Sequence, residues 1–316
     1  MKKIVYVTGC CGFIGAYVAI TCLKQGWYVI GVDKMTYAAN EDNLAMLATF
    51  GEQFKFIKSD INDLEKLYDC DYVINCAAET HVDNSIVSSK EFLHSNINGV
   101  QHLLELIRQK ERFKMPTLLH FSTDEVYGDI AEGSHTETDL LKPSNPYSAT
   151  KAAADMLILA WARTFKVPYI IVRPTNNFGV GQYVEKLIPK CCKAIRLGKK
   201  IPLHNYGQPK RVWLSAADTA NAVVTIINSG VQNEIFNVGG DSEYHNIDVV
   251  KEIIKLMDGG TKPIEEYCDF SYSRDGQDVR YSLDDSKLRK LGWKNECKFH
   301  DELKVVVEYY KEKFIW

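Results

Sequence analysis

The 316-residue sequence lacks the features of membrane, secreted and nucleic-acid-binding proteins. No apolar run approaches the roughly 20 residues that a membrane-spanning helix needs. The apolar stretch after Lys2 and Lys3 is too short for a secretory signal peptide and leads directly into a glycine-rich loop. The net charge is −3, which indicates no basic surface for nucleic acid. We therefore expect a cytoplasmic protein that binds neither membranes nor nucleic acid.

The cysteine pattern indicates neither a disulfide framework nor a metal site. The nine cysteines are an odd number, with no C-x-x-C pair and no metal-like spacing to histidine. Neighbours such as Cys10 and Cys11, or Cys191 and Cys192, seldom pair with each other. We expect free thiols in a reducing compartment, acting mainly as small packing residues, and no metal. Internal repeats, low-complexity tracts and flexible linkers are also absent from the sequence.

A glycine-rich loop joins the first predicted strand, at residues 3–7, to a predicted helix at 16–24. The loop reads GCCGFIG, and glycines at this spacing allow a tight turn and close approach of a pyrophosphate to the backbone. A second predicted strand ends in Asp33, about 20 residues later, where a carboxylate can accept hydrogen bonds from ribose hydroxyls and repel a 2′-phosphate. The pattern predicts a dinucleotide site that prefers NAD to NADP, although Lys34 could soften the preference. The alternative is a glycine turn needed only for packing, with Asp33 on the surface.

Strands and helices alternate in the first half of the chain, as in a parallel sheet covered on both faces. After Pro174 this alternation ends. The expected elements are strands at 28–32, 54–58, 72–75, 118–121, 169–172, 201–203, 212–214 and 235–238, helices at 92–109, 152–165, 184–197, 216–228 and 301–313, and a turn-rich loop at 175–181. We predict an α/β fold: a Rossmann-type doubly wound parallel sheet with a smaller, discontinuous α/β C-terminal substrate domain. The NAD-binding domain would comprise residues 1–173 plus about 212–240, and the second domain 174–211 plus about 241–316.

Three further strand ends carry candidate ligand contacts, because ligands of open α/β sheets bind at the carboxyl ends of the strands. Asp60 could meet an adenine amino group, or it could be only the N-cap of the following turn. Ala77 and Ala78 are small enough for a flat cofactor to lie against the backbone. His81 could contact a substrate, but on its own it is better explained as a loop histidine.

The segment 117–128, TLLHFSTDEVYG, is the most informative part of the sequence. Its buried strand ends in a hydroxyl and two adjacent carboxylates, Asp124 and Glu125, which is an unusual choice for stability alone. The alternative is a pair of capping residues at a strand-to-loop turn.

Tyr147 and Lys151 form a Y-x-x-x-K pair, four residues apart on one face of a predicted helix. A phenol with a pKa near 10 is a poor base at neutral pH, but a neighbouring ammonium and the positive nicotinamide of NAD⁺ both favour the phenolate. Tyr147 could then take a proton from a sugar or alcohol hydroxyl while hydride leaves the same carbon. Lys151 could also hold a nicotinamide ribose hydroxyl.

Seven segments, distributed over nearly the whole chain, together resemble one known family: TGCCGFIG, AAETHVDNS, STDEVYG, NPYSATK, RPTNNFG, EKLIP and RYSLDDSKLRKLGW. The chain resembles the extended short-chain dehydrogenase/reductases. Within them it is similar to the nucleotide-sugar 4,6-dehydratases that act on dTDP-glucose or UDP-glucose. Related epimerases share the glycine loop and the Y-x-x-x-K pair, but the Thr-Asp-Glu triplet is not expected in them.

The resemblance implies a role for each residue of the triplet. Thr123 and Tyr147 would hold the sugar 4-hydroxyl, and oxidation at carbon 4 would acidify the hydrogen on carbon 5. Glu125 would remove that proton as general base, and Asp124 would protonate the hydroxyl that leaves carbon 6. Hydride return to carbon 6 would give a 4-keto-6-deoxy sugar, as in deoxysugar and rhamnose biosynthesis, and regenerate NAD. Because like charges held close cannot both ionise cheaply, we predict that Asp124 is the protonated partner.

The resemblance also implies two sets of binding residues. The cofactor set is Gly9, Gly12, Phe13, Ile14, Gly15, Asp33, Lys34, Thr36, Asp60, Ile61, Ala77, Ala78, Ser95, Tyr147, Lys151 and Asn177. The nucleotide-sugar set is Thr80, His81, Thr123, Asn176, Lys186, Leu187, Pro202, His204, Arg211, Asn246, Arg280 and Tyr281. Two arginines of this set, Arg211 and Arg280, suit a bidentate clamp on phosphate.

Departures from the family pattern leave the base and sugar preference open. His204 stands where many dTDP-glucose enzymes have Tyr, which favours UDP-glucose. Phe178 and Val180 replace the Tyr and Pro common in that loop, and Val212 replaces a polar residue.

Other functions and an oligomer also follow from these patterns. A nucleotide-sugar epimerase or decarboxylase is the nearest alternative, and a non-catalytic NAD-binding regulator is an alternative of another class. A regulator should have a broken catalytic set, yet all five catalytic candidates are present. The helices near 92–109 and 150–165 carry more apolar surface than one sheet face absorbs. This surface is either core or the contact of a homodimer, which we expect.

Overall fold

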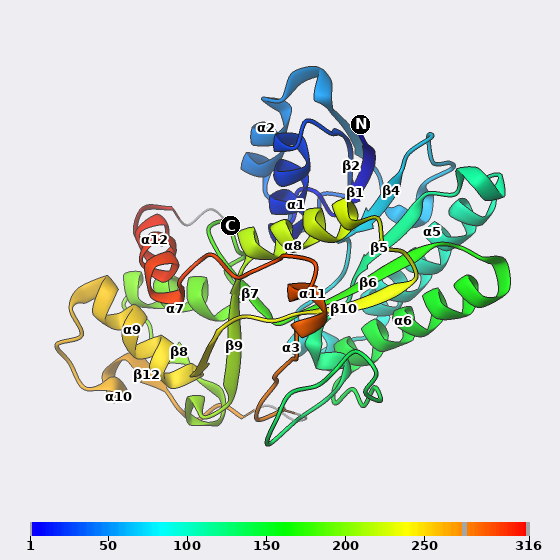
Figure 1. Cartoon of the computed structure of the whole chain (residues 1–316). Coiled ribbons are helices and arrows are strands. Elements are labelled where there is room, and N and C mark those ends of the chain that lie inside the picture. Colours follow the sequence, from blue (N-terminus) through cyan, green and yellow to red (C-terminus); the bar gives the residue numbers. More distant parts are fainter. Residues whose placement is uncertain (1, 274–276, 314–316) are drawn as a thin grey trace.

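A seven-stranded parallel sheet forms the centre of the computed structural model, which describes residues 2–273 and 277–313 (Figure 1). The strand order is β10-β6-β5-β4-β1-β2-β3, with every neighbouring pair parallel. The strands are β1 (Ile4–Thr8), β2 (Tyr28–Asp33), β3 (Phe54–Lys58), β4 (Tyr72–Asn75), β5 (Thr117–Phe121), β6 (Tyr169–Pro174) and β10 (Glu234–Val238). The order confirms the predicted Rossmann-type sheet. It reverses between β1 and β4, which places a crevice at the carboxyl ends of these strands.

Helices cover both faces of this sheet (Figure 1). They are α1 (Phe13–Lys24), α2 (Glu41–Ala48) and α8 (Ala216–Ser229) on one face, and α5 (Gly99–Arg108) and α6 (Pro146–Phe165) on the other. Successive side chains of a strand point to opposite faces, so one strand serves two cores. On β1, Val5 and Val7 pack with α1 and α8, whereas Tyr6 packs with α5 and α6, and all three are fully buried.

The helix predicted at 92–109 consists of three successive parts: α4 (Lys90–Phe92), a π-helical segment η3 (Leu93–Asn98) and α5. The wider turn is accompanied by contacts with the loop that follows β4. Asn96 donates hydrogen bonds to the Glu79 carbonyl (3.0 Å) and to the Thr150 hydroxyl (2.9 Å), and accepts one from the Glu79 N–H (2.9 Å). Such π-helical turns occur frequently at functional sites.

Two small sheets and their helices form a second region. The sheets have the orders β11-β9-β7 and β12-β8, and the helices pack on them around a separate apolar core. The elements are β7 (Asn176–Phe178), α7 (Leu187–Arg196), β8 (Ile201–Pro202), β9 (Lys210–Ser215), β11 (Ser242–His245), α9 (Asn246–Asp258), α10 (Ile264–Tyr267), β12 (Cys268–Asp269) and α12 (Phe299–Glu312). The remaining short elements are η1 (Gly51–Gln53), η2 (Ile61–Asp63), α3 (Val82–Val87), η4 (Arg112–Lys114), η5 (Asp124–Val126), η6 (His204–Gly207) and α11 (Ser286–Arg289).

Two expectations about this second region were wrong. The predicted loop at 175–181 contains strand β7, because Phe178 packs against Trp213 and Phe299, with ring centroids 6.0 and 5.1 Å away. The strand predicted at 212–214, which we had assigned to the NAD-binding domain, is part of β9 and pairs with β7 and β11 rather than joining the large sheet. Trp213 accordingly belongs to the second core. The other domain boundaries stay predictions.

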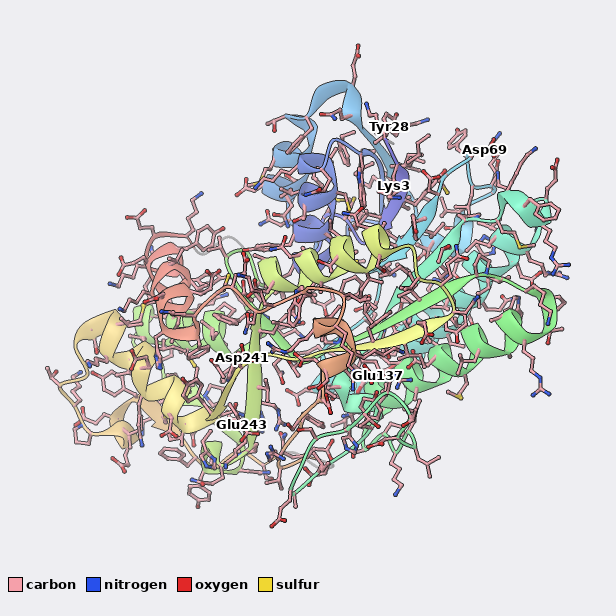
Figure 2. The ribbon with its side chains drawn as sticks, viewed as in Figure 1. Lys3, Tyr28, Asp69, Glu137, Asp241 and Glu243 are labelled. Atoms are coloured by element: carbon pink, nitrogen blue, oxygen red, sulfur yellow. The ribbon has the colours of Figure 1, made fainter. Side chains whose placement is uncertain are left out.

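The edge strand β10 is protected by polar side chains from a neighbouring loop. Glu137, labelled near the β10 ribbon in Figure 2, accepts a hydrogen bond from the Asn237 N–H (3.0 Å). The Asn237 amide donates to the His135 carbonyl (2.9 Å). These contacts occupy backbone groups that an exposed edge would offer to another chain. Within residues 2–273 and 277–313, no helix is both long and apolar enough to span a bilayer.

A buried ion pair joins β6 to helix α6. Arg173 contacts the Asp155 carboxylate through Nε and Nη2, at 3.0 and 2.9 Å, and both side chains are almost fully buried. Ser122 donates to the same carboxylate oxygen (3.0 Å), and Arg173 also donates to the Tyr127 hydroxyl (2.7 Å). The pair therefore fixes helix α6 relative to the end of strand β5.

Candidate active site

Three contiguous hollows open at the carboxyl ends of the parallel strands. The first hollow contains ten residues of the predicted cofactor set: Gly9, Gly12, Asp33, Lys34, Thr36, Asp60, Ile61, Ala77, Ala78 and Ser95. The central hollow is lined by Phe13, Ile14, Gly15, Thr123, Asp124, Glu125, Tyr147 and Asn177. The outer hollow is lined by Thr80, His81, Asn176, Lys186, Leu187, Pro202, His204, Arg211, Asn246 and Tyr281. The structure thus gathers nearly every predicted site residue along one crevice.

Two predicted residues do not line the hollows. Lys151 lies beneath the central hollow, with 3% of its surface exposed. Arg280, expected to clamp phosphate, pairs instead with Glu243 of β11 at 2.6 Å and donates to the Gly133 carbonyl at 2.9 Å. Glu243 is labelled beside the small sheet in Figure 2. Arg211 lines the outer hollow, whereas Arg280 does not and is paired with a carboxylate elsewhere.

The glycine loop permits a close backbone approach that larger residues would prevent. Gly9 has φ +67°, and a Cβ there would lie 2.8 Å from the Ala77 nitrogen. A Cβ on Gly15 would lie 2.0 Å from the Gly9 carbonyl oxygen. Helix α1 begins within this loop, with Gly12 as its N-cap, so the unpaired N–H groups of its first turn, at Phe13, Ile14 and Gly15, lie at the central hollow.

Acidic groups at the ends of β2 and β3 suit the ribose and base of a dinucleotide. The two Asp33 oxygens accept hydrogen bonds from the backbone N–H groups of Cys11 (2.9 Å) and Met35 (2.8 Å). Burial raises the pKa of Asp33, and these donors oppose the rise. The Lys34 ammonium lies 3.4 Å from the Asp60 carboxylate. The Lys34 charge is therefore already paired with a carboxylate, so Lys34 is less suited to bind the 2′-phosphate of NADP, and the expected preference for NAD is strengthened.

Asp60 is an N-cap that also lies in a hollow, and its contact with an adenine amino group stays a prediction. It caps η2 by accepting from the Asn62 N–H (2.9 Å), and it lines the first hollow. Burial disfavours its ionised form, but hydrogen bonds from Asn62 and His94 prevail and lower the pKa of Asp60 to about 2. The carboxylate is therefore a permanent acceptor at neutral pH.

The Thr-Asp-Glu triplet forms the turn η5 directly after β5. The Thr123 hydroxyl accepts from the Glu125 N–H (3.3 Å) and donates to Asp124 Oδ1 (3.1 Å). Asp124 is buried, and its Oδ2 has no hydrogen-bond partner among the described residues. Burial and the charge of Glu125 raise the pKa of Asp124 to about 7. A neutral carboxyl with one oxygen available is suited to protonating a bound ligand.

Glu125 differs from Asp124 because several groups favour its charged form. Burial raises the pKa of Glu125, while a hydrogen bond from the Asn145 amide (3.1 Å) and the charges of Arg211 and Lys186 lower it. Two adjacent carboxylates with unequal surroundings can divide acid and base roles.

The surroundings of Tyr147 do not match one sequence-based expectation. We expected Lys151 to favour the phenolate, but burial and the Glu125 charge raise the pKa of Tyr147, with a hydrogen bond to Thr123 opposing them. Lys151 is itself desolvated, which lowers the pKa of its ammonium to about 8. Its Nζ donates to the Phe121 carbonyl. The resting phenol is therefore neutral, and a further positive charge is needed to ionise it.

Sequence reasoning missed a row of buried polar side chains beneath Lys151. His120 Nε2 lies 3.4 Å from Lys151 Nζ, and His120 Nδ1 lies 3.0 Å from the Asn75 amide nitrogen. Asn75 in turn accepts from the Thr8 hydroxyl (2.6 Å). These residues lie on β5, β4 and β1 and are almost completely buried. The sequence feature that could have revealed this row is the presence of polar residues within strands that are otherwise apolar.

The outer hollow contains polar atoms that a ligand could satisfy. Asn176 Oδ1 and Asn246 Oδ1 are buried without hydrogen-bond partners in the described structure. Arg211 packs its guanidinium over the Tyr281 ring, 4.5 Å from the centroid, and Lys186 donates to the Thr80 carbonyl (3.0 Å). Buried orphan acceptors beside two cations suit a ligand with both hydrogen-bond donors and negative charge.

The described residues include one cluster with the composition of a metal site: Cys10, Cys11 and Asp33, whose ligand atoms lie within 4.8 Å of one another. Its surroundings do not suit a cation. The Cys11 thiol and burial raise the pKa of the Cys10 thiol, which holds it protonated, and Asp33 is occupied by backbone donors. Cys10 is therefore not a thiolate ligand at neutral pH.

Comparisons with known proteins agree with this geometry. A family model described as GDP-mannose 4,6 dehydratase matches residues 6–306. A dTDP-glucose 4,6-dehydratase of Neisseria meningitidis is 38% identical over 100% of this chain and 95% of its own length. A trifunctional Arabidopsis thaliana protein, which includes a UDP-glucose 4,6-dehydratase, is 37% identical over 99% of this chain and 48% of its own length. The crystal structure of the dTDP-glucose 4,6-dehydratase DesIV from Streptomyces venezuelae, with NAD and TYD bound, superposes with a TM-score of 0.91, 33% identity and coverage of 98% and 97% of the two chains.

The raised pKa of Asp124 gives a spectroscopic prediction. A protonated buried carboxyl has a C=O stretch that is lost on ionisation, so infrared difference spectra should show a band that disappears as the pH rises through about 7. Glu125→Gln should move this midpoint to lower pH, because it removes the neighbouring negative charge.

The assignment of the band rests on two variants measured at matched cofactor content. Asp124→Asn should abolish the band, and Asp139→Asn, which alters a carboxylate outside the hollows, should leave it in place. A band that persists in Asp124→Asn would show that another carboxyl titrates there.

Proposed function

The chain belongs to the nucleotide-sugar 4,6-dehydratases of the extended short-chain dehydrogenase/reductase family, and from this we propose that it is an NAD-dependent 4,6-dehydratase of UDP-glucose or dTDP-glucose. The product is the 4-keto-6-deoxy nucleotide sugar. The observation that carries the proposal is the unequal pair of buried Asp124 and half-buried Glu125 beside Tyr147 at the strand ends.

The first and central hollows fit NAD. The glycine loop and the α1 N-terminus suit the pyrophosphate, and Asp33 suits the ribose hydroxyls. NAD is also bound in the similar DesIV structure. The chemistry that bound NAD would supply is reversible hydride transfer, first from carbon 4 of the sugar and then to carbon 6. The positive charge of the oxidised nicotinamide ring would also favour ionisation of the Tyr147 phenol, which is otherwise neutral.

The chain's own side chains divide the proton transfers. Tyr147 takes the proton of the 4-hydroxyl, which Thr123 orients, as carbon 4 becomes a ketone. The ketone acidifies carbon 5, and Glu125 removes that proton. Asp124 donates its proton to the hydroxyl of carbon 6, and the carbon–oxygen bond breaks to release water. The unpartnered Oδ2 of Asp124 has the burial and freedom from competing contacts that this donation requires.

The protons balance over one turnover. Glu125 returns its proton to carbon 5 when hydride reaches carbon 6. The proton that Tyr147 took from the 4-hydroxyl replaces, directly or through solvent, the proton that Asp124 gave to water. The catalytic groups are thereby restored and the net loss is one water molecule.

The outer hollow is our proposed site for the nucleotide diphosphate. Arg211 and Lys186 supply positive charge, and Asn176 and Asn246 supply buried acceptors. The similar enzymes named above act on dTDP-glucose and on UDP-glucose. The activity assay described next therefore includes both nucleotide sugars.

Turnover of candidate sugars tests the proposal directly. The purified protein is incubated separately with UDP-glucose, dTDP-glucose and GDP-mannose, and the products are identified by mass spectrometry and NMR. We expect one of the two glucose nucleotides to lose a water molecule and form a 4-keto-6-deoxy sugar. A product that retains this water and is inverted at carbon 4 would indicate an epimerase, and NAD binding without turnover would indicate a regulator.

Replacing the acid should separate oxidation from elimination. Asp124→Asn should reduce turnover by ~10²–10⁴-fold, the usual contribution of a general acid or base. Oxidation at carbon 4 does not use this proton, so the absorbance of enzyme-bound NADH should still appear on mixing with substrate. Asp139→Asn provides a matched amide substitution away from the hollows. Wild-type turnover by Asp124→Asn would refute the acid role.

We also propose a homodimer formed through the helices near 92–109 and 150–165. Most apolar residues of α5 proved to be core, including Val100, Leu103 and Leu104. Three apolar side chains near these helices remain exposed: Leu93 on η3, Met156 on α6 and Val87 on α3. Helix α6 contacts both α3 and η3, so these exposed residues lie on adjacent elements.

The dimer has a direct test in solution. Met156→Glu should yield monomers in light scattering coupled to gel filtration, because it places a charge in an apolar contact. Phe113→Glu, at a fully exposed residue outside these helices, is the matched control and should remain dimeric. Unchanged mass for Met156→Glu would remove α6 from the interface.

A further inference from the structure

Asn145 connects the candidate base to the helix that carries the catalytic phenol. Its amide nitrogen donates to Glu125 Oε2 at 3.1 Å. Its amide oxygen accepts from the Ser148 N–H at 2.9 Å, and this bond caps α6 two residues before Tyr147. Asn145 is buried and lies at the edge of the outer hollow. This residue belongs to neither predicted binding set.

The orientation of the Asn145 amide follows from its partners. A backbone N–H can only donate, so the oxygen must face Ser148 and the NH₂ group must face Glu125. The Ser148 hydroxyl lies 3.3 Å from the Asn145 N–H and completes a capping box, and Pro146 occupies the first helical position. The Asn145 side chain is therefore held at two points, and its backbone N–H at a third.

Capping alone does not require asparagine at this position. Ser and Asp cap helices about as well as Asn. A serine would leave Glu125 Oε2 without the amide donor, and an aspartate would place a second negative charge against Glu125. Asparagine carries its acceptor and its donor on separate atoms, so it can bond the helix and the carboxylate at once, whereas serine has a single oxygen for both.

Resting on the function proposed above, we propose that Asn145 is a positioning residue that assigns the base role to Glu125. The two carboxylates receive different hydrogen bonds: Asp124 has a hydroxyl donor on one oxygen and nothing on the other, whereas Glu125 has an amide N–H. Asp124 is the more deeply buried of the two, which disfavours its charge, and the amide N–H donated to Glu125 favours the ionised form there, so the single negative charge of the pair settles on Glu125. Because the same amide caps α6, one side chain also fixes the base relative to Tyr147.

Other charged and titratable groups also act on Glu125. Arg211 on β9 and Lys186 at the start of α7 favour its ionised form, and Asp278 opposes it. The Asn145 hydrogen bond is the strongest of the influences that lower its pKa, after burial, which raises it. Asp124, Tyr147 and Tyr281 are the acidic groups whose own ionisation the Glu125 charge opposes.

The test compares two substitutions that preserve the cap and differ at Glu125. In Asn145→Ser the donor is lost, and in Asn145→Asp it is replaced by a charge. Melting temperature and NAD content should stay close to those of the wild type in both. We expect kcat of Asn145→Ser to fall by roughly ten- to a hundredfold, as for loss of a hydrogen bond to a charged group. Formation of bound NADH should persist, and substrate deuterated at carbon 5 should show a larger isotope effect.

The pH profile separates a positioning role from a packing role. Glu125 must be ionised to act, so kcat rises with pH through its pKa. Losing the donor raises that pKa, so the acid limb should move to higher pH in Asn145→Ser and further in Asn145→Asp. Ser148→Ala weakens the capping box but keeps the amide contact, so it should lower the melting temperature without moving the limb.

The outcomes are distinct from those that test the dehydratase itself. A wild-type kcat and pH profile in Asn145→Ser would overturn the proposal. The proposal would also be overturned if both variants lost stability, carbon 4 oxidation and carbon 5 proton removal to the same extent. Asn145 would then have only a capping role. If no nucleotide sugar is turned over, the proposed function fails, but infrared titration of Glu125 in wild type and Asn145→Ser still decides whether the amide lowers its pKa.

Discussion

Two carboxylates that follow each other in the chain, enclosed at the end of a buried strand, cannot both ionise at low cost. This constraint determines the design of the site. Asp124 is left with few donors and a raised pKa, whereas Glu125 receives an amide donor and faces two cations. The surrounding helix, turn and loop are arranged to maintain this inequality. It provides an acid and a base in adjacent positions without requiring a histidine.

The sheet provides the rigid frame on which this inequality depends. Strand β5 lies between β4 and β6, so the triplet after it emerges at the middle of the crevice. The buried pair of Arg173 and Asp155 connects β6 to α6 and reaches Ser122, one residue before the triplet. Removing one member of such a pair would leave an uncompensated buried charge, which is strongly destabilising. Tyr147 and the carboxylates are therefore positioned by contacts that cannot relax independently.

Much of the crevice was predictable from the sequence because the relevant signals are local. The glycine loop, Asp33, the triplet and the Y-x-x-x-K pair each follow a strand or begin a helix, and parallel strands bring such positions to one edge. Arg280 could not be excluded from the phosphate site, because its partner Glu243 lies 37 residues away and only pairing of the folded chain reveals it. Strand β7 was missed for a similar reason, since Phe178 gains its burial from Trp213 and Phe299. The raised pKa of Tyr147 results mainly from burial, which cannot be inferred from the spacing of residues in the sequence.

The π-helical segment at Leu93–Asn98 has a consequence for how this helix can change. Its turn accommodates one residue more than an α-helical turn, and within it Ser95 contacts Lys34 and Asn96 contacts Glu79, both of which line the first hollow. Deleting a residue there would rotate the following helix by about 100° relative to the sheet. Val100, Leu103 and Ile107 would then leave their places in the core. A deletion that made this helix regular would lose either its contacts at the crevice or its packing against the sheet. The irregular turn therefore restricts which deletions the protein can accept in this segment.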